Sequence, residues 1–200
     1  MITQNEVLEI FRSSGALLDG HFLLASGYHS ASYLEKFLVL QHPQHVARLC
    51  KELAEPFGTQ AVDVVLGPTT GGMLMAYEIA KHLGTRALYA ERGDDGKERV
   101  LRRGFKLEST ERVLVVDDIL TTGGSVNETI KLVTDAGAEL IGVAVMADRS
   151  GGAVDFGVPL HALVSIALEK FPPHAVPEWL AVIPLTERGS SHNLRPQDGK

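Results

Sequence analysis

The chain has 200 residues, a length that suits one well-buried α/β domain and little more. Its formal net charge is −6, which argues against binding to nucleic acid through overall charge. Cys50 is the only cysteine, so an intramolecular disulfide and a CxxC-type zinc site are excluded, and we expect it to be a packed helix residue.

The first segments are predicted to be helical. The opening MITQNEVLEIF is acidic and amphipathic, unlike a signal peptide, and Thr3-Gln-Asn-Glu6 is a capping-box pattern that predicts a helix over residues 3–14. Residues 15–41 are expected to be irregular to extended, with SGYHS as a turn. A second helix is predicted from Pro43 to Phe57, because proline suits a first helical turn.

The rest of the chain alternates short apolar strands with helices. Strands are predicted at residues 62–67, 86–91, 111–118, 138–148 and 161–168, and helices at 71–84 and 125–136. Such alternation is typical of βαβ units, so we expect an α/β fold with a central, mostly parallel sheet and helices on both faces. No repeat or low-complexity linker is visible, and we expect a single domain over residues 1–200.

Residues 91–110 interrupt this alternation. Asp94-Asp95-Gly96 is a turn signal between two polar arms and predicts a hairpin or mobile loop that projects from the sheet. The segment is either a solvated charged loop or a cationic flap that closes over an anionic ligand. Its basic residues are Arg92, Lys97, Arg99, Arg102, Arg103 and Lys106.

Three loops with unusual residues leave the carboxyl ends of predicted strands, where open α/β sheets bind ligands. They cover residues 67–72, 117–125 and 148–150. In the second loop, TTGGS at the start of a helix offers unpaired N–H groups, hydroxyl groups and the positive end of the helix dipole, which suit a phosphate monoester. It is not a P-loop, because the lysine of GxxxxGK[ST] is absent.

Asp117 and Asp118 stand directly before TTGGS. Two carboxylates beside a phosphate would repel the ligand unless they face hydrogen-bond donors or positive charge. A ribose with free 2- and 3-hydroxyl groups, near a magnesium ion, supplies both, so the stretch is interpreted as a site for ribose 5-phosphate. The alternative is that Asp118 caps a turn and Asp117 is a surface residue.

The stretch VLVVDDILTTGGS resembles the phosphoribosyl-diphosphate (PRPP) signature of the type I phosphoribosyltransferases. Within that family, nearly the whole chain resembles the orotate phosphoribosyltransferases. The likeness lies in GALLDGHFLLASGYHSASYLEK, VLGPTTGGMLMAYEIA, ALYAERGDDGKERVLRRGF, ADRSGG and IPLTERGSS. It implies a small N-terminal hood and a flexible hairpin loop added to the α/β core.

The resemblance also implies roles for individual residues. The aspartates would hold the ribose hydroxyl groups, and residues 121–125 would bind the 5-phosphate. Thr121 and Arg149 would lie near orotate, with the guanidinium facing a carboxylate, and Thr69, Thr70 and Gly71 would line the diphosphate side. The implied PRPP-binding residues are Arg92, Lys97, Asp117, Asp118, Ile119, Leu120, Thr121, Thr122, Gly123, Gly124 and Ser125.

The implied reaction transfers the phosphoribosyl group of PRPP to orotate, giving orotidine 5'-monophosphate and diphosphate for pyrimidine synthesis. No residue is expected to act as a strong acid or base, because orotate is acidic enough at N1. Mg²⁺ is the implied cofactor, held mainly by PRPP without direct protein ligands. Family members share their flexible loop across subunits, so a cytoplasmic homodimer without membrane or nucleic-acid partners is implied.

The chain departs from the family pattern at two places. A Lys or Arg usually precedes Ser-Gly in the first segment, where this chain has Ala25, and a Lys and a His of the flexible loop are replaced by Asp95 and Lys97. Lys36, Lys97 and Arg99 are candidates to supply the missing charge, and Arg102 and Arg103 are the favoured ones. The histidines His21 and His29 are expected to be surface or turn residues.

Two other functions stay open. A purine-type phosphoribosyltransferase is disfavoured because a purine offers no carboxylate to pair with Arg149. A PRPP-binding regulatory protein would usually need a helix-turn-helix or a basic face, and neither is evident in the sequence.

Overall fold

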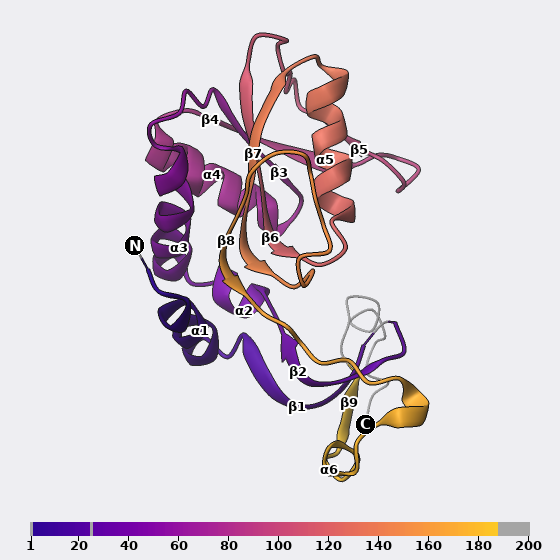
Figure 1. Cartoon of the computed structure of the whole chain (residues 1–200). Coiled ribbons are helices and arrows are strands. Elements are labelled where there is room, and N and C mark those ends of the chain that lie inside the picture. Colours follow the sequence, from indigo (N-terminus) through magenta and orange to yellow (C-terminus); the bar gives the residue numbers. More distant parts are fainter. Residues whose placement is uncertain (1, 25, 188–200) are drawn as a thin grey trace, which may run out of the picture.

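A computed structural model describes residues 2–24 and 26–187, which form two sheets (Figure 1). Neighbouring strands of the larger sheet are parallel, apart from the antiparallel pair β4–β5. The sheet therefore has the mostly parallel character that the alternation of strands and helices predicts. Its order is β5 (Arg99–Val100), β4 (Arg86–Arg92), β3 (Val64–Pro68), β6 (Arg112–Leu120), β7 (Glu139–Asp148) and β8 (Leu160–Ser165).

Helices cover both faces of this sheet, as predicted. Successive residues of a strand point to opposite faces, so Leu114 and Val116 enter the apolar cluster on one face, and Val113 and Val115 enter the cluster on the other. The first cluster also contains side chains of α1 (Gln4–Ser13), α3 (Pro43–Ala54) and α4 (Gly71–Leu83). The second contains side chains of α5 (Gly124–Asp135) (Figure 1).

The helix boundaries follow the sequence signals. The Thr3 hydroxyl accepts a hydrogen bond from the Glu6 N–H at 3.3 Å, and Glu6 Oε2 accepts one from the Thr3 N–H at 2.9 Å, so the capping box is confirmed. Pro43 lies in the first turn of α3, and the short helix η1 (Glu55–Phe57) follows it. Gly84 ends α4 with a φ of 69°, a left-handed conformation that favours glycine.

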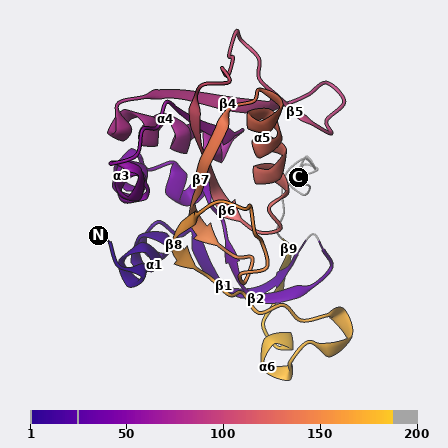
Figure 2. The ribbon, with the colours of Figure 1, turned by 45° about the horizontal axis from the view of Figure 1, so that its top comes forward.

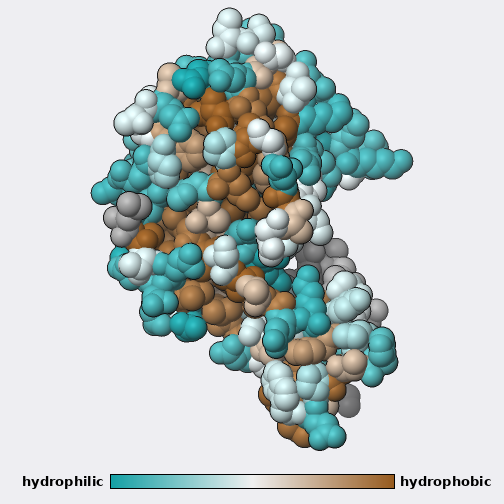
Figure 3. Space-filling view, viewed as in Figure 1, coloured by the Kyte–Doolittle hydropathy of each residue, from teal (hydrophilic) through white to brown (hydrophobic). Residues whose placement is uncertain are grey.

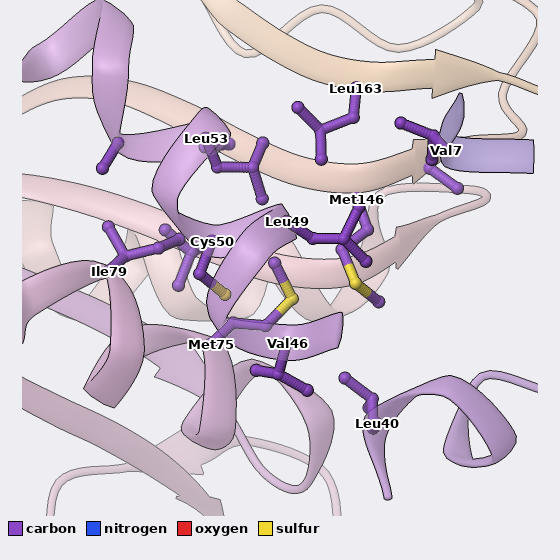
Figure 4. Packing of buried hydrophobic residues seen from close by; sticks show 14 of the residues in the cluster. Val7, Leu40, Val46, Leu49, Cys50, Leu53, Met75, Ile79, Met146 and Leu163 are labelled. Carbon is purple, nitrogen blue, oxygen red and sulfur yellow. The ribbon is translucent and has the colours of Figure 1, made fainter. Parts of the chain in front are cut away.

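The core between the helices and the sheet contains Cys50 beside Leu49 and Leu53 of α3 (Figure 4). Side chains of α4 and β7, including Met75 and Met146, close it from the other sides. Burial raises the pKa of the Cys50 thiol to about 12, with a further contribution from Glu78. The thiol is therefore an inert packing group, which confirms its prediction as a packed helix residue.

The hood is a second, three-stranded sheet. Residues 15–41 contain an antiparallel hairpin, which confirms the extended structure and the turn predicted there, and the short helix α2, which was not predicted. The sequence did not indicate the pairing of these strands, because Asp19, Gly20 and two serines, Ser30 and Ser32, mask an alternating pattern. The elements are β1 (Leu17–Leu23), β2 (His29–Leu34), α2 (Phe37–Leu40), η2 (Pro173–Ala175), α6 (Glu178–Ala181) and β9 (Leu185–Glu187), and the sheet order is β2-β1-β9.

His21 is buried in the hood, so its prediction as a surface or turn residue was wrong. Its side chain is only 6% exposed. Nε2 lies 2.6 Å from Nδ1 of His29, and Nδ1 lies 3.1 Å from the carbonyl oxygen of Ile183. The two histidines therefore help to hold the C-terminal segment against β1 and β2.

Residues 91–110 form the predicted hairpin, which projects from the edge of the large sheet. The Gly93 N–H donates to the carbonyl of Glu98 at 2.8 Å, and β5 pairs with the end of β4. The hairpin lies beside α5 in two views (Figures 1 and 2) and forms a hydrophilic projection on the surface (Figure 3). None of the helices in the described ranges is long and apolar enough to cross a membrane.

Candidate active site

The site lies at the carboxyl end of β6, which points toward the hood (Figure 1). The strand runs to Leu120, two residues beyond its predicted end, because Ile119 and Leu120 still pair with Ala147 and Asp148 of β7. Leu120 is 1% exposed and belongs to the core. Both aspartates are therefore part of a central strand, and the turn-capping alternative for Asp118 does not apply.

Asp117 is buried, with 5% of its surface exposed, so it is not a surface residue. Its carboxylate accepts hydrogen bonds from the Ser125 hydroxyl at 2.7 Å and from the Asp118 N–H at 2.8 Å. Burial, followed by the nearby charge of Asp118, raises the pKa of Asp117 to about 6 against these hydrogen bonds. These hydrogen bonds thus stabilise the negative charge only in part.

Asp118 is held from the opposite side of the strand. It is 1% exposed, and Lys36 Nζ lies 2.9 Å from Oδ1 and 2.8 Å from Oδ2. A methyl group at Gly71 would lie 1.6 Å from Oδ2, so only glycine fits at this start of α4. Lys36 comes from the hood, and the sequence named it only as one of several possible sources of charge.

Residues 121–125 form a loop that leads into the first turn of α5, and we call it the phosphate loop. Thr121 and Thr122 are exposed, whereas Gly123 is buried with a φ of 80°, where a methyl group would approach Val154 to 3.0 Å. The first N–H groups of a helix have no partner within it, so the start of α5 presents donors here. The loop therefore has the local structure that the sequence predicts for anion binding.

The implied diphosphate side, Thr69 to Gly71, joins β3 to α4. Thr69 donates its N–H to Ala90 of β4 at 2.9 Å. Arg99 Nη1 lies 3.4 Å from the Thr69 hydroxyl and 3.1 Å from the Ala90 carbonyl. Arg99 is only 7% exposed, and its Nε has no hydrogen-bond partner among the described residues. A buried arginine thus supports this loop. The polar composition of the hairpin does not indicate that one of its arginines is buried.

The other basic residues of the hairpin are directed elsewhere. Arg102 pairs with Asp94 at 2.6 Å and Arg103 with Glu91 at 2.9 Å, both within the hairpin. Neither arginine contacts a site loop of its own chain in the described residues, and the expectation that they supply charge to a site stays a prediction. The structure instead brings Lys36 and Arg99 to the site loops; Ala25 itself lies outside the described residues.

Arg92 and Lys97 occupy different settings on the hairpin. Arg92 Nη1 lies 2.7 Å from Oε2 of Glu128 on α5 and 3.3 Å from the Lys97 carbonyl. Lys97 is exposed near the tip, beside the Asp94-Asp95-Gly96 turn. Arg92 is thus close to the phosphate loop through Glu128, whereas Lys97 is not brought to it by any contact in the described residues.

Arg149 reaches the same edge of the sheet from the end of β7. Its N–H donates to the carbonyl of Leu120 at 2.8 Å, which fixes its backbone beside the end of β6. Burial lowers the pKa of the guanidinium, partly offset by Tyr33 of the hood, and its buried Nε has no hydrogen-bond partner among the described residues. A partly buried guanidinium whose Nε has no acceptor among the described residues is suited to an anionic ligand.

Comparison with known proteins identifies this arrangement. Residues 39–155 match the model of the phosphoribosyl transferase domain. The orotate phosphoribosyltransferase of Caldicellulosiruptor bescii is 45% identical over 189 residues, which cover 94% of this chain and 98% of that protein.

Solved structures give the same result. The orotate phosphoribosyltransferase of Aeropyrum pernix superposes with a TM-score of 0.67 at 27% identity and covers 80% of this chain and 93% of its own. The Mycobacterium tuberculosis enzyme, in complex with inorganic phosphate, has a TM-score of 0.66 at 26% identity and covers 82% and 96%. The chain therefore belongs to the orotate phosphoribosyltransferases, within the phosphoribosyltransferase family.

Proposed function

We propose that the protein transfers the phosphoribosyl group of PRPP to orotate, giving orotidine 5'-monophosphate and diphosphate in pyrimidine synthesis. The observation that carries the proposal is the buried pair Asp117–Asp118 at the end of β6. Asp117 is bonded to Ser125 of α5, and Leu120 of the same strand end is bonded to the backbone of Arg149. Family membership supports the same activity. The related M. tuberculosis enzyme was solved in complex with inorganic phosphate, an anion of the kind that we propose for this site.

PRPP would lie across the end of β6. The N–H groups and hydroxyls of residues 121–125 would bind its 5-phosphate, and the acidic pair would accept hydrogen bonds from the ribose hydroxyls. Its diphosphate would face Thr69, Thr70 and Gly71, where Arg99 supplies positive charge from behind the loop. Arg149 would pair with the carboxylate of orotate, which a purine base lacks.

In the reaction, N1 of orotate attacks C1 of PRPP, the C1–O bond breaks, and diphosphate leaves with the bonding electrons. The chain contributes mainly by holding the two reactants in line, because orotate is acidic enough at N1 to need no strong base. Carboxylates beside the ribose stabilise positive charge that develops on the ring. Arginines near the diphosphate stabilise the leaving group.

Mg²⁺ is proposed to enter with PRPP. Carboxylate oxygens of the acidic pair are of the kind that this ion prefers, but Asp118 is already paired with Lys36. In residues 2–24 and 26–187, no group of three or more His, Cys, Asp or Glu side chains could hold a metal ion. When bound, the ion would offset negative charge on the departing diphosphate.

The decisive experiment is a spectrophotometric assay of orotate consumption with PRPP and Mg²⁺, run beside adenine, hypoxanthine and uracil. Of the four bases, we expect only orotate to be consumed with PRPP and Mg²⁺. Turnover with a purine base would support the purine-type alternative, and PRPP binding without turnover of any base would support the regulatory alternative.

Replacement of Arg149 should change base binding selectively. Arg149→Ala is expected to raise the KM for orotate roughly 30- to 1,000-fold, because a charge-assisted contact is worth ~2–4 kcal/mol, with little change in the KM for PRPP. Arg48→Ala removes an exposed arginine that pairs with Glu6 at 2.8 Å and serves as the control. Equal effects of Arg149→Ala on both KM values would assign this arginine a structural role.

Asp117 should make PRPP binding pH-dependent. Only the ionised carboxylate accepts hydrogen bonds at both oxygens, and its pKa is raised to about 6. Affinity for PRPP, measured by calorimetry, should therefore decline as the pH falls below about 6. Asp117→Asn should bind PRPP weakly and without this pH dependence.

The same variant should gain stability at high pH. Because the pKa of Asp117 in the folded protein lies above the ordinary value of 3.8, the folded state binds more protons than the unfolded state between these values, and ionisation at higher pH is destabilising. Asp117→Asn should raise the free energy of unfolding by about 1–3 kcal/mol at pH 8 and by little at pH 4. Urea titrations at the two pH values measure this, and an equal change at both would contradict it.

We further propose a homodimer in which the hairpin completes the partner's site. An Asp117→Asn/Asp118→Asn variant and an Arg92→Ala/Lys97→Ala variant should each be inactive. After subunit exchange, mixed dimers would contain one intact site, so up to about a quarter of wild-type activity should return. No recovery after exchange has been verified by mass spectrometry would mean that each chain completes its own site.

A further inference from the structure

The connection between β7 and β8 (residues 149–159) packs against the phosphate loop. A methyl group at Gly123 would lie 3.0 Å from Val154 Cγ1 and 3.4 Å from Cε1 and Cζ of Phe156, so both side chains face this glycine directly. Both are half-buried and pack against the apolar cluster that contains Val126 of α5. The connection lies beside the first turn of this helix (Figure 1). The phosphate loop is therefore backed by apolar side chains of a neighbouring segment.

Hydrogen bonds hold this connection at both ends and in its middle. At its start, the Ser150 N–H donates to Oδ1 of Asp148 at 2.7 Å. At its end, the carbonyl of Pro159 accepts a hydrogen bond from the N–H of Val143 in β7 at 2.9 Å. Between the two apolar residues, the exposed Asp155 accepts a hydrogen bond from the Gly157 N–H at 2.8 Å. The connection is thus fixed well enough to support another loop.

The N-cap of α5 explains why such a support is needed. This position is Gly123, whereas Ser, Thr, Asp or Asn usually stands there and accepts hydrogen bonds from the first N–H groups of the helix through its side-chain oxygen. That oxygen would compete with a phosphate for the same donors. Glycine leaves the donors available, but its backbone is free to adopt other conformations. The carbon atoms of Val154 and Phe156 restrict the loop without accepting a hydrogen bond.

We propose that Phe156 and Val154 are positioning residues for the 5-phosphate: their contact with Gly123 holds the first N–H groups of α5 in the orientation that binds this anion. They act through the loop and do not touch the ligand. The same connection begins at Arg149, whose N–H donates to the Leu120 carbonyl at 2.8 Å and whose guanidinium we assign to orotate. One connection thus positions both halves of the site, the base side at its start and the phosphate side further along. Because the roles of the loop and of Arg149 come from the proposed function, the inference rests on it.

Calorimetry on the full chain tests the proposal with two probes, ribose 5-phosphate and inorganic diphosphate with Mg²⁺. Phe156→Ala removes the ring behind Gly123, so the affinity for ribose 5-phosphate should fall roughly tenfold, less than the ~100-fold that a misplacement of ~1 Å can cost. Diphosphate, which we assign to residues 69–71, should bind as it does to the wild type. Phe156→Leu keeps an apolar contact and should restore most of the affinity for ribose 5-phosphate. In the steady state, the KM for PRPP should rise in Phe156→Ala with little change in the KM for orotate.

Two valines of the connection provide a matched pair. Val154 and Val158 are both half-buried against the same apolar cluster, but Val154 faces Gly123, whereas Val158 precedes Pro159, which is bonded to Val143 in the middle of β7. Val154→Ala should weaken binding of ribose 5-phosphate roughly threefold, because it removes only part of the contact. Val158→Ala makes the same change in volume and should leave this affinity unchanged. The midpoint of thermal unfolding of each variant, measured without ligand, separates lost stability from lost positioning.

Unchanged binding of ribose 5-phosphate by Phe156→Ala and Val154→Ala would overturn the proposal. Equal losses for ribose 5-phosphate and diphosphate, or an equal loss in Val158→Ala, would overturn it too, because the effect would then be a general loss of structure. If Phe156→Ala does not fold, the comparison of the two valines decides. If the wild type neither binds ribose 5-phosphate nor consumes orotate with PRPP, the proposed function fails and this inference fails with it. Normal wild-type turnover with unimpaired variants would refute the role of the connection alone.

Discussion

The ion pair between Lys36 and Asp118 is the interaction on which the site depends. Asp118 is almost fully buried, and a buried carboxylate without a cation would cost several kcal/mol. The cation comes from the hood, so neutralising this charge also fixes the hood over the carboxyl end of the parallel sheet. Gly71 allows α4 to begin against the same carboxylate, because no other residue leaves room for Oδ2. One electrostatic requirement therefore positions the hood, the diphosphate side and the end of β6 together.

Several buried groups around this ion pair are incompletely paired and lower the stability of the fold. Asp117 has a raised pKa, and a buried guanidinium nitrogen of both Arg99 and Arg149 has no hydrogen-bond partner among the described residues. Polar groups that are buried and incompletely paired are unfavourable for folding, and proteins concentrate them at functional sites. A ligand with hydroxyl groups, a carboxylate and phosphate oxygens offers partners to all of them. The same features that weaken the fold thus describe the chemistry of the proposed substrates.

The large sheet and its helices could be predicted from the sequence because their signals are local. The capping box at Thr3, Pro43 in a first helical turn and Gly84 at a helix end each act within a few residues, and the apolar strands are buried on both faces. The hood was expected only from the resemblance to the family, because its polar, glycine-containing strands show no clear alternation. The ion pairs of Lys36 with Asp118 and of Arg99 with Glu128 could not be predicted, because each joins segments whose proximity exists only in the folded chain.

Because Asp117 and Asp118 are adjacent in the sequence, they suggest a single acidic group, but their side chains lie on opposite faces of the strand. Neighbouring residues of a strand point to opposite faces, so Asp117 turns toward Ser125 of α5, whereas Asp118 turns toward Lys36 and the start of α4. The pair is therefore not one acidic patch. Asp118 is already neutralised by a cation and is held in place before any ligand arrives. Asp117 has only a hydroxyl and an N–H as partners, and its raised pKa shows that they do not fully stabilise its charge. Oδ2 of Asp118, however, is buried without a hydrogen-bond partner among the described residues, whereas both oxygens of Asp117 accept one. We infer that Asp118 both assembles the site and keeps an acceptor oxygen for a ribose hydroxyl, and that Asp117 links the end of β6 to α5.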